Sequence, residues 1–214
     1  MIISPTKIPK TIGVRTRRAC SELADASKLI FVDVEPTSDA LPNKCVLNVR
    51  DVVNNEGGEV VLGWSISLWP DVMIQCIGHA VHKSNTGLRC VTPDKDGCER
   101  ILFLPDSSLT FDFDDPQARL PTKMIPLCKD PLVARLIENE EREYLIKCRY
   151  PRGADTIEVR GNDAIELRRL DEAKPELVRR VFLRTKHHND TCVCGSGRKF
   201  RKCCRPKMLA VGPA

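Results

Sequence analysis

The chain has 214 residues, of which 42% are hydrophobic and 29% are charged, and its formal net charge is +5. These are ordinary globular values, so they exclude a wholly disordered chain, and the length allows one domain with a small appendage. No apolar run approaches the roughly 20 residues that span a bilayer, and the first residues lack the apolar stretch of a secretory signal. We therefore expect a soluble, cytoplasmic protein.

The charge is distributed unevenly along the sequence. Residues 1–20 contain five Lys or Arg and no acid, residues 186–214 carry +6, and the residues between them carry −6. We expect residues 1–20 to form a basic N-terminal arm. The sequence thus predicts an acidic body between two basic ends, and the basic ends are suited to phosphates or acidic protein surfaces.

The body, residues 21–160, has the pattern of an α+β domain, an antiparallel sheet with flanking helices. Residues 21–30 and 46–53 have apolar side chains at helical spacing. Residues 129–147 indicate another helix, with Asp130 near its N-cap. Between these helices, turn-forming residues separate strand-like segments, which is typical of an antiparallel meander; the segments are 59–69, 72–82, 88–92 and 100–104.

A charged segment connects the body to the C-terminal tail. Residues 161–186 have helical spacing and many charges, and we expect Pro175 to divide this helical connector into two pieces, because proline removes a backbone donor. The remaining residues, 187–214, form the tail.

The eleven cysteines fall into two groups. Seven are scattered singly through the body, and an odd, dispersed set argues against a disulfide framework. The other four lie within thirteen residues of the tail, as Cys192, Cys194, Cys203 and Cys204. Two close pairs joined by a short loop can close a tetrahedral thiolate shell, so we predict one zinc ion per chain. The ligand type also allows another soft metal, and His187 or His188 is an alternative ligand.

The tail resembles a known zinc-binding motif. Residues 191–204 match every position of C-x-C-G-S-G-x-K-[FY]-x-x-C-[CH], the SEC-C motif found at the end of the SecA translocation ATPase and on many otherwise unrelated proteins. The resemblance implies zinc binding by the four cysteines and docking onto a partner, either a protein or the ribosome. The chain has no G-x-x-x-x-G-K-[ST] segment, so the ATPase activity is not implied.

A cysteine and a histidine of the body suggest a second kind of site. Cys45 lies at the start of a predicted helix, where backbone N–H groups favour a thiolate, and His79 lies on a predicted strand. Over residues 40–106 this order resembles the transglutaminase-like branch of the papain-type fold. The resemblance implies an amidase or acyltransferase with Cys45 as nucleophile and His79 as base. Asp94 is the candidate acid, since Cys90 occupies the position where the family pattern has its acid.

Two further interpretations remain open at this point. Cys45 and His79 are also compatible with a structural role in a packed core. The basic tail is also compatible with RNA binding, with Phe200 stacking on a base.

Overall fold

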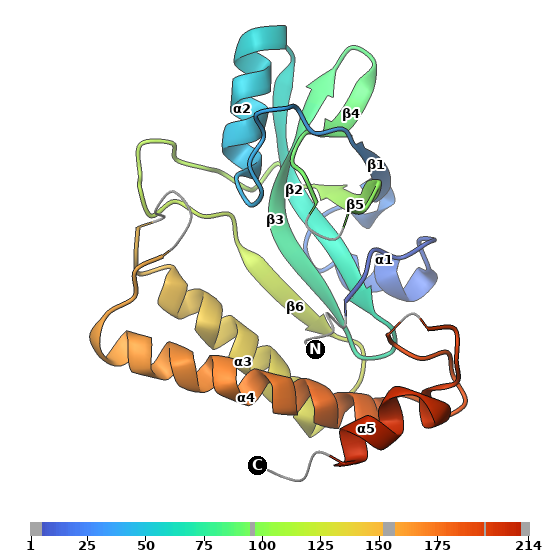
Figure 1. Cartoon of the computed structure of the whole chain (residues 1–214). Coiled ribbons are helices and arrows are strands. Elements are labelled where there is room, and N and C mark those ends of the chain that lie inside the picture. Colours follow the sequence, from blue (N-terminus) through green and yellow to red (C-terminus); the bar gives the residue numbers. More distant parts are fainter. Residues whose placement is uncertain (1–5, 95–96, 152–156, 195, 211–214) are drawn as a thin grey trace. The chain divides into compact units, whose positions relative to one another are not determined.

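The computed structural model describes residues 6–94, 97–151, 157–194 and 196–210, which form two compact units (Figure 1). The sheet unit comprises residues 6–68 and 74–125, and the helical unit comprises residues 69–73 and 126–210. Helices together with a mixed sheet confirm the predicted α+β class. The finer division into arm, body, connector and tail stays a prediction.

The sheet contains six strands, and five of them close into a ring. The strand order is β2-β5-β1-β4-β3-β6, and β2 also pairs with β3, so β6 is the strand outside the ring. The strands are β1 (Ile30–Val34), β2 (Glu59–Trp69), β3 (Met73–Ser84), β4 (Gly87–Cys90), β5 (Arg100–Pro105) and β6 (Thr122–Pro126). The four predicted strand segments correspond to β2–β5, whereas β1 and β6 were not predicted.

Strand β1 makes the sheet mixed and not a simple antiparallel meander. It lies between β5, with which it pairs antiparallel, and β4, with which it pairs parallel. The predicted helix over residues 21–30 is wrong, because this stretch holds only the 3-10 turn η1 (Ala26–Lys28) before β1 begins. One buried cluster draws on four of the strands and explains the insertion of β1; its members are Val32, Val81, Cys90, Ile101 and Phe103.

The described part of the predicted N-terminal arm is a structured edge of the sheet unit. The backbones of Lys7 and Leu68 exchange two hydrogen bonds, of 3.1 and 2.8 Å. Helix α1 (Val14–Cys20) buries Thr16, Ala19 and Cys20, while its arginines stay exposed. The basic charge of this segment therefore lies on the surface of a packed element.

Helix α2 (Cys45–Glu56) confirms the predicted helix over 46–53 and packs on the sheet through its valines, against Ala80 and Val91. Hydrogen bonds from buried polar side chains fix both ends of the helix. Asn48 donates to the hydroxyl of Thr92 at 3.1 Å, and His82 Nε2 lies 2.8 Å from the carbonyl oxygen of Gly57. Because a buried polar group is costly without a partner, these contacts set the position of α2 on the sheet.

The helical unit contains α3 (Pro131–Lys147), α4 (Gly161–Thr185), the 3-10 turn η2 (Phe200–Lys202) and α5 (Cys204–Ala210). The carboxylate of Asp130 accepts a hydrogen bond from the backbone N–H of Leu132 at 2.8 Å, so the predicted N-cap of α3 is confirmed. In the ranges that the structure describes, none of the helices has both the length and the apolar character needed to cross a bilayer.

Helix α4 is continuous, so the predicted break at Pro175 is wrong. Proline removes the hydrogen bond to the carbonyl of Asp171, but both residues are exposed and water can satisfy that carbonyl. Contacts with α3 also support the helix on the N-terminal side of the proline. Asn139 donates to the carbonyl of Leu170 at 3.2 Å, and Lys174 pairs with a carboxylate of α3 at 2.6 Å.

The ring of strands leaves no room for a side chain at Gly63. A Cβ atom there would lie 2.3 Å from the carbonyl oxygen of Leu104 on β5 and 2.6 Å from the ring of Phe103. We expect Gly63→Ala to lower the free energy of unfolding by about 1–3 kcal/mol, measured by urea denaturation. Gly13→Ala, where nothing lies within 4 Å of the added carbon, is the control and should cost less than about 1 kcal/mol. Equal stabilities of the two variants would contradict the close approach of β2 and β5.

Candidate metal centre

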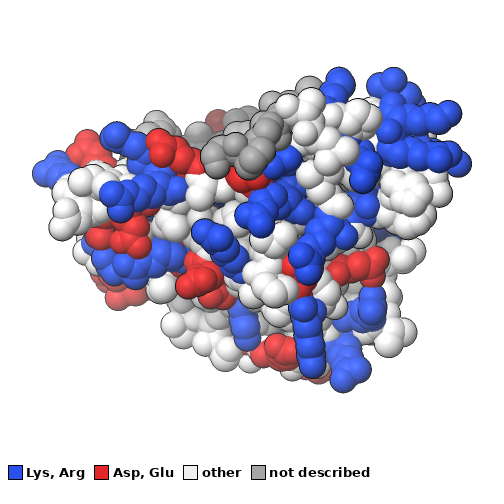
Figure 2. All heavy atoms as spheres, turned by 90° about the horizontal axis from the view of Figure 1, so that it is seen from below, with Lys and Arg blue, Asp and Glu red and all other residues white. Residues whose placement is uncertain are grey.

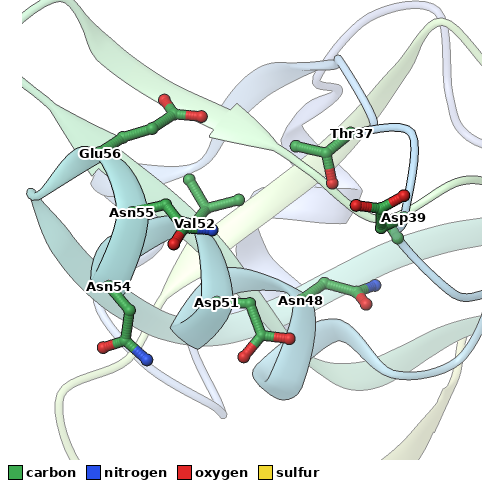
Figure 3. A pocket seen from close by; sticks show the side chains of 9 residues that line it. Thr37, Asp39, Asn48, Asp51, Val52, Asn54, Asn55 and Glu56 are labelled. Carbon is green, nitrogen blue, oxygen red and sulfur yellow. The ribbon is translucent and has the colours of Figure 1, made fainter.

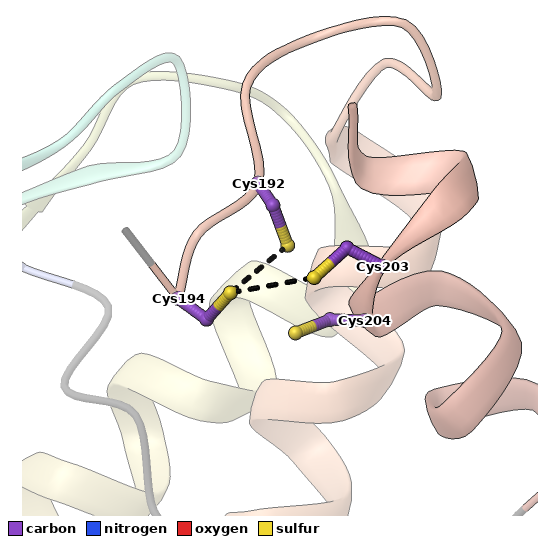
Figure 4. Close-up of side chains that lie close together, drawn as sticks. All are labelled: Cys192, Cys194, Cys203 and Cys204. Carbon is purple, nitrogen blue, oxygen red and sulfur yellow. Dashed lines mark hydrogen bonds between the residues drawn. The ribbon is translucent and has the colours of Figure 1, made fainter. Parts of the chain in front are cut away.

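Four thiols converge at the end of the helical unit, as the sequence predicted. The sulfur atoms of Cys192, Cys194, Cys203 and Cys204 all lie within 4.8 Å of one another (Figure 4). The Cys194 sulfur is 3.5 Å from the sulfurs of both Cys192 and Cys203. A tetrahedral ion with metal–sulfur bonds of 2.3 Å requires sulfur atoms about 3.8 Å apart. The cluster therefore has the size of a four-thiolate metal site.

Short-range backbone contacts bring the two cysteine pairs together. The backbone N–H of Cys192 donates to the carbonyl of Arg198 at 2.7 Å, and an isolated bridge joins Thr191 to Lys199. Gly197 has a φ of +71°, in the left-handed region that glycine adopts without strain, and this permits the tight turn. The turn presents the first pair of cysteines, and η2 then leads back to Cys203 and to the start of α5.

Two side chains near the cluster bear on what it can do. The Ser196 hydroxyl lies 3.3 Å from the sulfur of Cys203. Phe200 is 0% exposed, so the hypothesis that its ring stacks on a base is wrong. Burial is the favourable state of such a large apolar ring.

Hydrogen bonds around the cluster affect its thiols unequally. Hydrogen bonds with Ser196 and with neighbouring thiols lower the pKa of Cys194 to about 6, and Ser196 also lowers the pKa of Cys203. Burial, together with interactions with the neighbouring thiols, raises the pKa of Cys204 to about 12. With this lowered pKa, the exposed Cys194 is ionised at neutral pH. Because the thiolate is the form that binds a metal, Cys194 is suited to make the first contact with a cation.

An arginine of α4 contacts α5, the helix that begins at Cys204. Arg179 forms a bidentate ion pair with Glu176, with both N–O distances at 2.6 Å, and its Nη1 donates to the carbonyl of Met208 in α5 at 2.5 Å. His187 and His188 are not among the groups that converge with the four thiols, so the structure does not favour either imidazole as an alternative ligand.

The structure places the predicted catalytic residues in the sheet unit, with Cys90 in contact with the histidine. Cys45 is the half-buried first residue of α2, and Asp94 is exposed. His79 lies on β3, and its Nε2 is 3.2 Å from the sulfur of Cys90. In the sequence analysis Cys90 was noted only because it stands where the family pattern has its acid. That position was the signal that could have identified Cys90 as the partner of His79.

Burial keeps both members of this contact uncharged. It lowers the pKa of His79 to about 4, against the opposing effect of Asp94, and it raises the pKa of the Cys90 thiol to about 11. Cys90 also lies 3.6 Å from the carbonyl oxygen of Thr92, its hydrogen-bond acceptor. A neutral imidazole therefore lies against a neutral thiol, and the pair holds no thiolate at neutral pH.

A polar hollow along α2 includes none of the predicted site residues (Figure 3). Its lining consists of carboxylates, amides and a hydroxyl, mainly from α2 and the preceding loop; among them are Thr37, Asp39, Asn48, Asp51 and Glu56. Asn48 is already hydrogen-bonded to Thr92 and to the backbone of Leu41, and Glu56 is paired with Arg89. The side chain of Asn48, a buried polar group of the hollow, therefore has its hydrogen-bond partners within the protein and needs no ligand.

The half-buried His79 predicts how stability depends on pH. His79 stays neutral in the folded chain down to about pH 4, whereas an unfolded histidine takes up a proton near pH 6.5. The free energy of unfolding is therefore independent of this group above pH 6.5. It decreases as the pH falls from 6.5 toward 4, by at most about 3 kcal/mol. We expect His79→Gln to reduce the difference in unfolding free energy between pH 7.5 and pH 4.5. The exposed His187→Gln is the control, and a variant at His79 that keeps the full wild-type difference would contradict the neutral state of this imidazole.

Comparison with known proteins supports the assignment of the cysteine cluster. The family model of the SEC-C motif matches residues 189–206, a segment that contains all four converging cysteines. No curated protein and no solved structure matches the chain. The transglutaminase-like resemblance finds no support in these comparisons and stays a prediction. The chain thus carries a SEC-C motif at residues 189–206, folded so that its four cysteines can hold one metal ion.

Proposed function

We propose that the knuckle, residues 187–210, binds one zinc ion and docks the rest of the protein onto a partner. The observation that carries the proposal is the convergence of four thiols within 4.8 Å in a matched SEC-C motif. Four thiolate ligands fill a tetrahedral shell and leave no position for water or substrate. This ligand set supports a structural zinc ion that cross-links the chain and does not take part in catalysis.

The docking role is supported by the charge of the knuckle. Residues 187–210 carry +5, and four thiolates holding one Zn²⁺ would contribute −2, which leaves about +3. Such a surface favours a partner with negative charge, in the form of a protein or the ribosome, and the proposed location is the cytoplasm. The zinc ion, when bound, would supply a fixed cross-link between the turn at Cys192 and the start of α5.

Zinc content provides the direct test of this proposal. We expect the purified full-length protein to contain one zinc ion per chain by mass spectrometry of the metal, and the double variant Cys192→Ser/Cys194→Ser to contain none, because two thiolates do not complete the shell. Cys148→Ser, which removes a half-buried thiol outside the cluster, should keep one zinc ion. Wild-type protein prepared without chelators that contains no zinc would exclude the proposal.

A cysteine–histidine hydrolase or acyltransferase is the second candidate function. Cys90 interacts electrostatically with Cys45 and with Asp94. Asp94 also interacts with His79, which supports one shared region for these four groups. In this proposal Cys45 is the nucleophile at the N-terminus of α2, and His79, neutral at pH 7, is the base. Asp94 is the proposed third member, although it is Cys90 that contacts the imidazole.

Thiol labelling tests the second candidate. We expect iodoacetamide to modify Cys45 with an apparent pKa below the ordinary value of about 8.5, and His79→Ala to slow the reaction about tenfold or more, because the base would be lost. The half-buried Cys128 is the internal reference, and peptide mass spectrometry separates the two sites. If Cys45 reacts no faster than Cys128, the enzymatic proposal must be abandoned.

A further inference from the structure

Most cations of the knuckle are exposed, and no ion pair with an acid is found for them among the described residues. Between residues 198 and 207 the chain has six Lys or Arg and no acid; these are Arg198, Lys199, Arg201, Lys202, Arg205 and Lys207. All are exposed except Arg205, which is half-buried. Within the part of the chain that the structure describes, no ion pair joins any of the six to a carboxylate, since Asp190 pairs with Lys186 and His187.

The remaining cations of the helical unit are neutralised to a much larger extent. Arg142 pairs with Glu166, Arg149 pairs with Asp163, and Lys174 lies between two carboxylates of α3. Figure 2 shows Lys and Arg side chains, in blue, gathered at the right-hand edge of the face seen from below. Among the described residues, six cations without an ion pair lie within ten residues of the knuckle, and this density of positive charge attracts a polyanion.

The knuckle offers little of the apolar surface on which protein interfaces depend. Tight protein–protein interfaces are usually anchored by aromatic and other large side chains that become buried on binding. Phe200 is fully buried, and within the described part of the knuckle Leu209, at 53%, is the large hydrophobic residue with substantial exposure. The surface is therefore suited to a partner held by charge along its whole length, as a nucleic-acid backbone is.

Two stacked imidazole rings lie beside these cations. The rings of His187 and His188 have centroids 4.3 Å apart and planes 31° apart, and both residues are exposed. The carbonyl of His188 accepts a hydrogen bond from the backbone N–H of Arg201 at 2.9 Å, so the stacked pair is held against the turn that carries Arg201 and Lys202. Exposed planar rings next to cations are what unpaired bases require, because a base stacks on a ring while its phosphate contacts a cation.

We infer that the knuckle binds single-stranded RNA, with its Lys and Arg side chains on the phosphates and the His187–His188 pair stacked on a base. This inference rests on the proposed function, because the knuckle must be folded around its metal to present the two rings and the cations together. Binding is independent of base sequence and weakens as salt increases, since phosphate contacts release counterions.

Fluorescence anisotropy of a labelled oligouridylate with the zinc-loaded full chain tests the inference. We expect the double variant Arg201→Ala/Lys202→Ala to bind more than tenfold more weakly at low salt, and to flatten the plot of log affinity against log salt by about 1.4, which corresponds to two lost phosphate contacts. Arg168→Ala/Arg169→Ala removes the same charge from two exposed residues of α4 and should bind like the wild type. Equal losses in the two double variants would overturn the inference, because net charge alone would then explain binding.

A second pair of variants separates stacking from charge. His187→Ala/His188→Ala should weaken binding about tenfold without changing the salt dependence, because stacking on a base releases no counterions. If polyglutamate of matched charge displaces the RNA as well as unlabelled RNA does, the site takes an acidic protein and the RNA inference fails. Zinc is measured in every sample: wild-type protein with one zinc ion and no RNA binding refutes this inference alone, whereas protein without zinc refutes the proposed function.

Discussion

In the proposed metal-bound state, the fold of the C-terminal segment would depend on the attraction between four thiolates and one cation. Between residues 187 and 210 the described side chains that are buried are those of Cys192, Phe200 and Cys203, which is far too little apolar surface to order a chain of this length. A cation held by the four thiolates would supply the missing free energy and would tie the turn at Cys192 to the first residue of α5. The positions of the cations and of the paired histidines would then follow from that cross-link.

The sheet unit is specified by a different constraint, the pairing of its buried polar groups. Asn48 and His82 hold the two ends of α2, and the carboxylate of Asp106 accepts hydrogen bonds from Trp64 at 2.8 Å and from Ser108. Burial raises the pKa of Asp106, but these donors outweigh it and keep the pKa below its usual value. Each pairing would be costly to break, so a single register of helix and strands is favoured. The His79–Cys90 contact, uncharged on both sides, fits the same pattern.

The features predicted from the sequence are those whose partners lie nearby in the chain. The four metal-binding cysteines lie within thirteen residues, and β2 to β5 are separated by short turns, so local spacing was sufficient. Strand β1 was missed because it pairs with β4 and β5, more than fifty residues away, and only that pairing makes Ile30–Val34 a strand. Pro175 was expected to end a helix, but solvent on its exposed side and the packing of α4 on α3 outweigh the lost hydrogen bond. The contact of His79 with Cys90 depends on strand register, which a sequence pattern gives only within a residue or two.

The proposed metal centre and the basic surface of the knuckle have charges of opposite sign. Their arrangement decides which charge an approaching partner meets first. A zinc ion held by the four thiolates would form a centre with two negative charges, and of its ligands Cys192 and Cys203 are at most 8% exposed whereas Cys194 is exposed. Most of the cations lie at exposed positions. Charges farther than about 8 Å from a ligand are largely screened at physiological salt, so an approaching polyanion interacts mainly with the charges that it meets first, and exposed cations outnumber the exposed thiolate on this segment.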